Sequence, residues 1–487
     1  MLPTLIVLLS LAVSVLASES ADNVAKELSR EVQEEFSGRD YRDELEFLKK
    51  QFSSTHPRND TLIRIPNELN INHNHTLFEG DIHLTPEQWK AALDIDPSTR
   101  RRRQAIYNLT QMWQPMGAPV IPYMFVQGFR ELLGTIAYLG SKTVIRKNSS
   151  LPPEYSLTST QYQQVVKDAM AFWSSRTCVR FRQAMNNDNA FIIFNHNAAG
   201  CSSSVGRRKG GQYVNLEAPL CMTNSIITHE LSHVFGTLHM QSRVDRDSYV
   251  QIDLTNVEQG MDHNFAMEPS GFSTYGLPYE YGSIMHYFPY AFSIDPELPT
   301  IYAKADFLRY QGSMDGPQAT FWDTQLINKM YKCTDKCAKQ MPCYNGGVTD
   351  GASCSKCFCP KGWAGTYCET RPTNAQVINV DTTVQKVKLE FGVMEKGFEE
   401  KLVILQAPAG KRMEAIVNSF GPHRFPGCRN IGLEIVPYTD TRSAQLRFCG
   451  QVPYPSKPIY TDGNTMLFWL YRDINLPVTV EVSVRAF

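Results

Sequence analysis

The sequence has little net charge and no long hydrophobic run beyond its first residues. Its 48 basic and 49 acidic side chains leave a net charge of -1. Proteins that bind nucleic acid usually carry a clear basic excess, so a nucleic-acid partner is disfavoured. Because no later stretch is apolar enough to span a bilayer, we expect no membrane anchor. At 487 residues the chain is too long for one compact core, and its length predicts about three structural units.

Cysteine is absent from the first 177 residues, and the twelve cysteines that follow are an even number. In an oxidising compartment such a set is typical of six disulfides, with unpaired core thiols as the alternative. The compartment is indicated by residues 1–17, where a short apolar run ends at Ala17. We interpret this run as a secretory signal peptide, although the basic residues that usually precede the apolar part are missing. The sequence therefore predicts a secreted, extracellular protein.

Four Asn-x-Ser/Thr sequons agree with a secretory route and predict N-glycosylation, although each is a weak signal by itself. They begin at Asn59, Asn74, Asn108 and Asn148.

Residues 18–103 form a polar, cysteine-free segment that ends in four consecutive arginines, Arg100 to Arg103. Such a run can be a solvated charged surface. Between a signal peptide and a cysteine-bearing domain, however, it favours cleavage after Arg103 by a basic-specific processing protease. Residues 18–103 are then a pro-segment, and that processing protease is an expected partner.

Residues 104–333 predict a mixed domain. Residues 190–195 are short, β-branched and aromatic, which is typical of a buried strand. Residues 160–174 place apolar side chains near helical spacing and predict a helix packed on the core. Strands followed by helices in a domain of this size indicate an α+β fold.

Residues 334–369 hold six cysteines, a density typical of a small module that disulfides stabilise in place of a hydrophobic core. The spacing of Cys357, Cys359 and Cys368 resembles an EGF-like module. The sequence alone leaves the connectivity open. The resemblance implies the pairs Cys337–Cys354, Cys343–Cys357 and Cys359–Cys368.

Residues 374–487 alternate apolar and polar side chains in short runs, as in residues 478–484, and predict a β-sandwich. Cys428 and Cys449 are spaced as in the second disulfide of a CUB domain. The unit therefore resembles a divergent CUB domain, without the first cysteine pair that is usual there.

The chemistry is concentrated in an eleven-residue motif from His229 to His239. On a helix, His229 and His233 lie one turn apart on one face, so both imidazoles can reach one ion. Gly236 lets the chain leave the helix sharply and bring His239 round as a third ligand. Three neutral nitrogens with an open position indicate a catalytic Zn²⁺ site, one per catalytic domain, with Glu230 as the general base.

Two alternatives compete with this interpretation. A short His-Glu-x-x-His pattern can occur by chance on a surface helix, but the full pattern in a secreted chain disfavours chance. A structural zinc would need a fourth side-chain ligand, often cysteine, and the nearby cysteines are better used in disulfides.

Two longer matches extend the motif. It continues as Arg243-Val-Asp-Arg-Asp247, and Tyr281-Gly-Ser-Ile-Met-His-Tyr287 follows about forty residues later. This combination resembles the astacin family of metzincins, and the likeness covers most of residues 104–333. Further matches are Thr177-Cys-Val-Arg-Phe181, Gly200-Cys201, Val205-Gly-Arg207 and Ile327-Asn-Lys-Met-Tyr-Lys-Cys333.

The resemblance implies a zinc metalloendopeptidase with two lobes and the metal at the floor of the cleft between them. Met285 would form a turn beneath the three histidines. Tyr287 would be a fifth zinc ligand that can move to bond the oxyanion of the reaction. The family's disulfides would map to Cys178–Cys333 and Cys201–Cys221, and the expected substrates are extracellular or matrix proteins.

The pro-segment contains Phe78-Glu-Gly-Asp81, which matches the family's inhibitory motif. In that arrangement the Asp81 carboxylate binds zinc in the zymogen, and Gly80 permits the close approach of the backbone. A surface turn is the alternative, because Gly-Asp is common in turns.

The sequence also departs from the family pattern. Met240 stands where the family usually has a glutamate that meets the new N-terminus, so that salt bridge cannot form through residue 240. Thr237 and Ser202 replace the usual Phe and Trp. The stretch between Tyr123 and Gln161 is longer than usual by about two dozen residues, judged against ordinary loop lengths.

A different class of function stays open on sequence grounds. The protein could be a catalytically inert adhesion or matrix-binding protein that acts through its EGF-like and CUB-like modules. These modules could also bind matrix or substrate proteins for an active enzyme. The intact ligand and base residues favour the enzyme.

Overall fold

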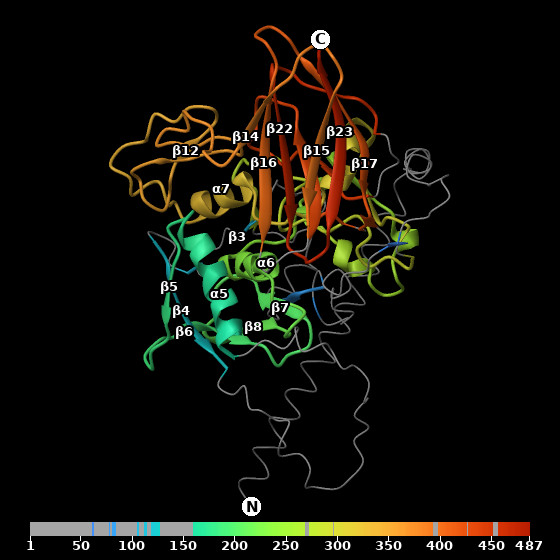
Figure 1. Ribbon diagram of the computed structural model, residues 1–487. Coiled ribbons are helices and arrows are strands. Elements are labelled where there is room, and N and C mark those ends of the chain that lie inside the picture. Colours follow the sequence, from blue (N-terminus) through green and yellow to red (C-terminus); the bar gives the residue numbers. More distant parts are fainter. Residues whose placement is uncertain are drawn as a thin grey trace, which may run out of the picture.

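A computed structural model describes most of the chain after residue 158 and short stretches before it. The described residues are 61–62, 77, 80–83, 105–106, 112–113, 118–126, 159–267, 272–295, 297–392, 398–425, 427–450 and 456–487. The predicted signal peptide, the cleavage site at Arg103 and the glycosylation sites Asn59, Asn74, Asn108 and Asn148 lie outside these residues, as does most of the stretch between Tyr123 and Gln161. In Figure 1 the region drawn in green lies below the orange and red C-terminal sheets.

A six-stranded sheet forms one lobe of the region predicted to be catalytic. Its strand order is β2-β7-β8-β6-β4-β5. The strands are β2 (Ile82–His83), β4 (Val120–Phe125), β5 (Arg180–Gln183), β6 (Ala190–Asn195), β7 (Cys201–Ser204) and β8 (Gly210–Leu216). The predicted strand at 190–195 is confirmed with these bounds. At the far edge, β2 pairs in parallel with β7, so a segment of the predicted pro-region completes the sheet.

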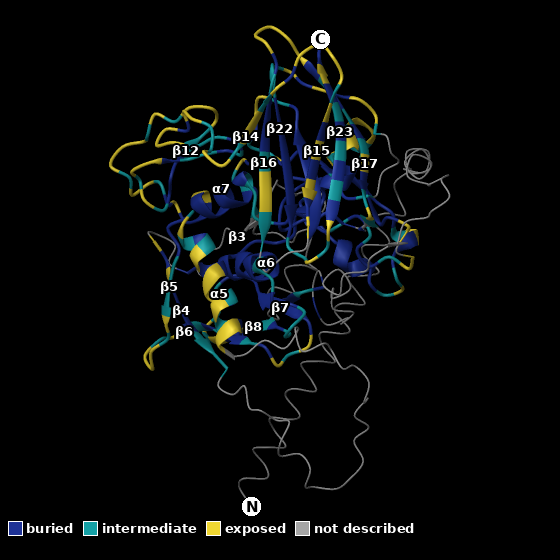
Figure 2. Ribbon diagram, viewed as in Figure 1, coloured by how far each residue is buried: buried dark blue, intermediate teal, exposed yellow. Residues whose placement is uncertain are grey.

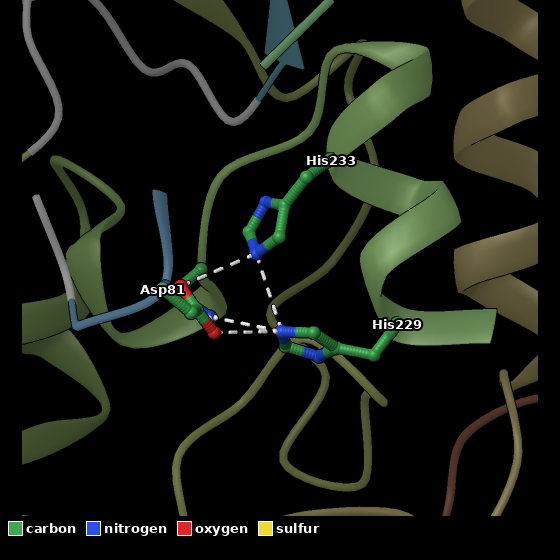
Figure 3. Close-up of side chains that lie close together, drawn as sticks. Asp81, His229 and His233 are labelled. Carbon is green, nitrogen blue, oxygen red and sulfur yellow. Dashed lines mark hydrogen bonds and ion pairs between the residues drawn. The ribbon is translucent and has the colours of Figure 1, made fainter. Parts of the chain in front are cut away.

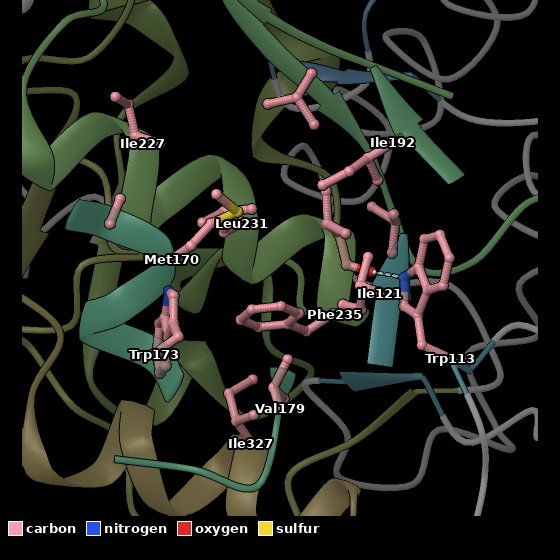
Figure 4. Packing of buried hydrophobic residues seen from close by; sticks show 14 of the residues in the cluster. Trp113, Ile121, Met170, Trp173, Val179, Ile192, Ile227, Leu231, Phe235 and Ile327 are labelled. Carbon is pink, nitrogen blue, oxygen red and sulfur yellow. Dashed lines mark hydrogen bonds between the residues drawn. The ribbon is translucent and has the colours of Figure 1, made fainter. Parts of the chain in front are cut away.

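Two helices cover this sheet, and their buried side chains pack with those of the strands in one hydrophobic core. Helix α5 (Ser159–Ser174) confirms the helix expected at 160–174, and α6 (Asn224–Phe235) packs beside it. Figure 4 shows Trp173 of α5 against Phe235 of α6, with ring centroids 5.4 Å apart. The outer face of α5 is exposed, whereas α6 is almost wholly buried (Figure 2). Helix α6 therefore lies in the interior of the protein.

The second lobe is built mainly from short 3₁₀ turns. They are η4 (Met240–Ser242), η5 (Arg246–Ser248), η6 (Leu254–Asn256), η7 (Asp262–Phe265) and η8 (Ala305–Ser313). Two small pairs accompany them, β9 (Val250–Ile252) with β11 (Ile301–Ala303), and β3 (Ala105–Ile106) with β10 (Phe272–Ser273). Helix α7 (Phe321–Met330) ends this region and begins at a capping box in which Thr320 and Asp323 bond each other's backbone.

The twelve cysteines form six disulfides, the same six pairs that the resemblances imply. They are Cys178–Cys333, Cys201–Cys221, Cys337–Cys354, Cys343–Cys357, Cys359–Cys368 and Cys428–Cys449. The chain has no free cysteine. The alternative of unpaired core thiols is thereby excluded.

The cysteine-dense segment contains one small pair, β12 (Val348–Thr349) with β13 (Cys357–Phe358). Two sheets follow it and face each other across one apolar core. The strand orders are β14-β16-β22-β19-β20 and β15-β23-β17-β21. The first sheet contains β14 (Gln376–Asn379), β16 (Glu399–Gln406), β19 (Ile431–Val436), β20 (Leu446–Phe448) and β22 (Thr465–Arg472). The second contains β15 (Gln385–Phe391), β17 (Met413–Gly421), β21 (Ile459–Tyr460) and β23 (Val478–Ala486).

Strand β15 alternates buried and solvent-facing residues, as the sequence pattern predicts for a sandwich strand. One further short pair joins β1 (Thr61–Leu62) to β18 (His423–Arg424). Within the described part of the chain, no helix has the length and apolar character needed to cross a membrane.

Candidate metal centre and active site

Helix α6 presents two histidines of the motif on one face. The helix begins at Thr223, whose side chain accepts a hydrogen bond from the Ile226 amide, and ends at Gly236. Gly236 has φ 113°, a left-handed conformation that favours glycine, and its amide bonds the carbonyls of the last turn. The chain therefore turns away directly after α6 and brings His239 back toward His229 and His233.

The Nε2 atoms of the three imidazoles converge. His229 Nε2 lies 3.2 Å from His233 Nε2 and 3.3 Å from His239 Nε2. Backbone carbonyls contact the opposite nitrogens of two rings: Ile284 O is 2.7 Å from His229 Nδ1, and Thr237 O is 2.8 Å from His233 Nδ1. With the proton on Nδ1, the Nε2 lone pair points into the cluster, which is the tautomer that a metal ligand needs. Burial lowers the pKa of His229 to about 4, so its imidazole is neutral at neutral pH.

Asp81 adds a carboxylate to this cluster, as Figure 3 shows. Its oxygens lie 3.1 Å from His229 Nε2, 3.3 Å from His239 Nε2 and 3.5 Å from His233 Nε2. The four ligand atoms all lie within 4.8 Å of one another. Three imidazole nitrogens and one carboxylate oxygen are a donor set that suits zinc. The residues therefore fit a zinc ion.

Strand β2 explains why Asp81 reaches the centre. The Asp81 carbonyl accepts a 2.9 Å bond from the Ser203 amide of β7, and Gly80 has φ 76° immediately before it. Burial by itself would raise the pKa of Asp81, but the neighbouring His239 and His233 outweigh it and hold the pKa well below its usual range. The carboxylate is therefore ionised, as a metal ligand must be.

Glu230 is adjacent to the first histidine and is 1% exposed. Its Oε2 atom is buried and has no hydrogen-bond partner among the described residues. Burial and the negative charge of Asp81 raise the pKa of Glu230 well above its usual range. A buried carboxyl next to the cluster, with one oxygen available, can hold and accept a proton there.

The segment after the zinc motif packs under the cluster. The Met240 amide donates a 2.8 Å bond to the Met285 carbonyl, which ties the third-histidine loop to the turn at 281–287. Tyr287 is buried, and its ring centroid lies 4.7 Å from that of His239. Its amide donates a 3.0 Å bond to Gln241 Oε1. The part of Tyr287 as a fifth ligand stays a prediction.

Two of the residues that depart from the family pattern, Met240 and Ser202, make well-defined contacts in the structure. Met240 is 2% exposed and packs in the apolar cluster of the second lobe, where its Sδ lies 3.9 Å from Arg243 Nη1. A thioether in that position carries no charge with which to bind an N-terminal ammonium. Ser202 Oγ lies 3.1 Å from His83 Nε2, so this β7 side chain contacts the predicted pro-segment.

Sequence reasoning missed three residues that hold the site together: Gln241, Glu280 and Asp323. The Asp323 carboxylate accepts bonds from Ser283 Oγ at 2.5 Å and from the Ile284 amide at 3.0 Å. Each of the three is buried and polar, and Gln241 and Glu280 belong to no recognisable spacing pattern. The sequence signal for Gln241 and Glu280 is only their proximity to the histidine motif or to the segment around Met285, whereas Asp323 could have been found from the capping-box pattern that it forms with Thr320.

Comparisons with known proteins agree with this geometry. Residues 146–332 match the family model described as Astacin (Peptidase family M12A). The chain is 33% identical over 340 residues to the zinc metalloproteinase nas-29 of Caenorhabditis elegans, covering 67% of this chain and 63% of that protein. It is 30% identical over 426 residues to the zinc metalloproteinase nas-23 of the same nematode, covering 84% of this chain and 72% of that protein.

Among solved structures, the chain is similar to high choriolytic enzyme 1, a hatching enzyme zinc-protease from the fish Oryzias latipes. The two are 28% identical, the match covers 47% of this chain and 98% of the other, and the TM-score is 0.37. The chain spans 63% and 72% of the two nematode relatives, so each relative extends beyond the match. The match to nas-23 nevertheless runs through most of both proteins, and the histidine motif lies inside the matched family region. The chain therefore belongs to the astacin family, peptidase family M12A.

Proposed function

We propose that the protein is a secreted zinc metalloendopeptidase that is synthesised as a latent precursor and cleaves extracellular proteins. The convergence of three histidine Nε2 atoms beside the buried carboxyl of Glu230 is the observation that carries this proposal. In the same proposal residues 1–17 are the signal peptide, 18–103 the pro-segment and 104–333 the protease. Residues 334–369 are an EGF-like module and 374–487 a CUB-like domain.

Each residue of the site has a distinct part in peptide hydrolysis. His229, His233 and His239 would hold zinc, which when bound supplies Lewis acidity that polarises a carbonyl and acidifies water. Glu230 accepts a proton at its carboxylate during attack and returns it to the leaving amine. The Tyr287 hydroxyl donates a hydrogen bond to the oxyanion.

The edge strand β7 is the proposed docking site for the substrate backbone. It packs against α6, which carries His229 and His233, and among the described residues only the two-residue β2 pairs with its outer edge. An extended peptide can add to such an edge through backbone hydrogen bonds. While β2 occupies β7 and Asp81 occupies the fourth ligand position, both substrate and water are excluded. Cleavage after Arg103 would release this block.

A loading experiment tests the proposal. The precursor is treated with a basic-specific protease, and cleavage of a peptide library is measured before and after removal of the metal with a chelator. We expect cleavage only after processing, loss of cleavage on chelation, and recovery on addition of zinc. A processed chain that binds zinc but cleaves no peptide would instead support the adhesion alternative.

A further inference from the structure

The C-terminal β-sandwich contacts the protease region through a buried arginine. Arg447, in β20, is 3% exposed. Its guanidinium donates to two carbonyls of the protease region, Ser313 O at 3.1 Å and Asp315 O at 2.8 Å. Its Nε donates to Glu434 Oε2 of its own domain at 2.8 Å. Arg447 thus joins two regions that are far apart in the sequence.

The same contact reaches the segment that precedes Met285. A Cβ atom placed on Gly282 would lie 2.1 Å from Ala444 Cβ and 2.8 Å from Arg447 Nη2, so the Gly282 backbone lies against these two side chains with no space for a side chain of its own. The buried carboxyl group of Glu280 joins them, because its Oε1 atom accepts bonds from both the Gly282 amide and the Ala444 amide, each at 3.1 Å. The sandwich therefore fixes the position of residues 280–282.

This segment leads directly to a ligand. Two residues after Gly282, the Ile284 carbonyl contacts His229 Nδ1 at 2.7 Å, the bond that sets the ring's tautomer and orientation. The Ile284 amide is held by Asp323 of α7. The neighbouring residue in α7, Trp322, donates a 2.9 Å bond to Ser443 Oγ of the sandwich. Both supports of Ile284 therefore lie against the residues just before β20.

We propose that Arg447 is a positioning residue for the metal centre, through which the C-terminal sandwich fixes the 280–284 segment and thereby the orientation of His229. The inference rests on the proposed zinc site and adds a part for the domain behind it. Taking an arginine out of water is strongly unfavourable unless it is well paired. The pairing is supplied by Glu434, which also accepts a 2.6 Å bond from Lys361 of the cysteine-dense module. The protease region, the cysteine-dense segment and the sandwich thus meet at one charge cluster, formed by Lys361, Glu434 and Arg447.

The first test replaces Arg447 in the full-length precursor. Zinc affinity is measured by competition with a chromophoric chelator, and the ligand field by the absorption spectrum of the cobalt-substituted protein. We expect Arg447→Met to raise the zinc dissociation constant about tenfold, as changes to residues that orient metal ligands do, and to alter the cobalt spectrum. Arg447→Lys, which keeps the charge but loses the forked geometry, should recover part of the affinity. Arg485→Met is the matched control, because Arg485 lies in the same domain and is 47% exposed.

The second test approaches the contact from the protease side and does not require the loss of a buried charge. Gly282→Ala introduces a methyl group against Ala444 and should weaken zinc binding in a protein whose melting temperature stays well above the assay temperature. Ala444→Gly removes the atom that the new methyl would meet. The double variant Gly282→Ala with Ala444→Gly should therefore bind zinc more tightly than Gly282→Ala alone.

The outcomes distinguish failure of the proposed zinc site from failure of the positioning role of Arg447. If the wild-type chain binds no zinc, the proposed function itself fails. If the wild type binds zinc and the folded Arg447→Met and Gly282→Ala variants match it in affinity and in cobalt spectrum, the sandwich only covers the protease and the positioning role is wrong. A drop in melting temperature with unchanged zinc affinity would overturn it in the same way.

Discussion

Glu230 and the three histidines occupy one cluster, yet replacing Glu230 and replacing a histidine should have different effects on zinc content and peptide cleavage. Glu230→Ala removes the proposed general base and leaves every ligand nitrogen in place. We expect zinc content near that of the wild type and a loss of peptide cleavage of roughly 10²- to 10⁴-fold. His239→Ala should instead lower the zinc content. Metal analysis together with peptide cleavage measures both effects.

The control for these variants is Glu390→Ala, because Glu390 is an exposed carboxylate on β15 with 55% of its side chain accessible. It should change neither zinc content nor cleavage. Loss of zinc from Glu230→Ala would contradict the general-base assignment, because it would show that Glu230 holds the metal or the fold.

Asp81 offers a second test at the residue scale. In a precursor whose Arg100 to Arg103 are replaced by alanine to prevent processing, Asp81→Ala removes the carboxylate that lies 3.1 Å from His229 Nε2. We expect the uncleaved Asp81→Ala precursor to cleave peptides at least roughly ten times faster than its Asp81 parent, because a ligand position opens. Peptide cleavage by the two uncleavable precursors is compared directly. Equal silence with zinc bound would mean that the pro-segment inhibits by filling the cleft and not through Asp81.

Among the secondary-structure elements, α6 carries the most function, and its ends are fixed by single residues. The Thr223 hydroxyl accepts a 3.2 Å bond from the Ile226 amide at the first turn. Thr223→Ala should cost about 1 kcal/mol of unfolding free energy, the usual value of a lost N-cap. Thr223→Ser keeps the hydroxyl and should cost much less. Denaturant unfolding of both variants measures the difference, and equal losses would show that the cap contributes nothing.

Elements were predictable from the sequence where their signal is local. The spacing of His229 and His233 and the glycine at 236 describe one helix and its end, and the strand at 190–195 is a single apolar run. The pairing of β2 with β7 could not be predicted, because a two-residue strand has no periodicity and its partner lies more than a hundred residues away. The motif at Asp81 indicated a zinc ligand without indicating how the backbone would reach the metal.

The contact between Gly282 and Ala444 was equally hidden in the sequence. A glycine can be required by a turn, by a positive φ or by a close neighbour, and the sequence does not separate these reasons. Here a close neighbour from another domain requires it. Buried charges such as Glu434 also look like ordinary strand residues in an alternating pattern until their partners from other regions are placed.

At the scale of the whole molecule, the charge cluster of Lys361, Glu434 and Arg447 predicts how the unfolding free energy changes at acid pH. Burial alone would raise the pKa of Glu434, but Lys361 and Arg447 outweigh it and lower the pKa to about 2 from an ordinary 4.5. A lowered carboxyl pKa contributes stability that is complete above about pH 4.5 and is lost as pH falls toward 2. The neighbouring carboxyl group of Glu280 also interacts with Arg447. Burial raises the pKa of Glu280 to about 8, so in the folded protein it does not titrate between pH 4.5 and 2.

The test compares the wild type with Glu434→Gln, in which residue 434 cannot titrate. The wild type should exceed the variant in unfolding free energy by an amount that is constant from pH 5 to 7. The difference should shrink by on the order of 3 kcal/mol between pH 4.5 and 2. Melting temperatures recorded across this range follow it. A difference that stays constant down to pH 2 would contradict the pairing of Glu434 with Lys361 and Arg447.

The disulfide between Cys178 and Cys333 joins residues separated by 155 positions, and the whole histidine motif lies inside the loop that it closes. A single backbone cut anywhere between these two cysteines opens this loop, but the disulfide keeps the two fragments, and the histidines that they carry, covalently attached. Damage of this kind would be invisible on a non-reducing gel and would appear only after reduction. One backbone cleavage in this loop therefore does not separate the protein into two molecules.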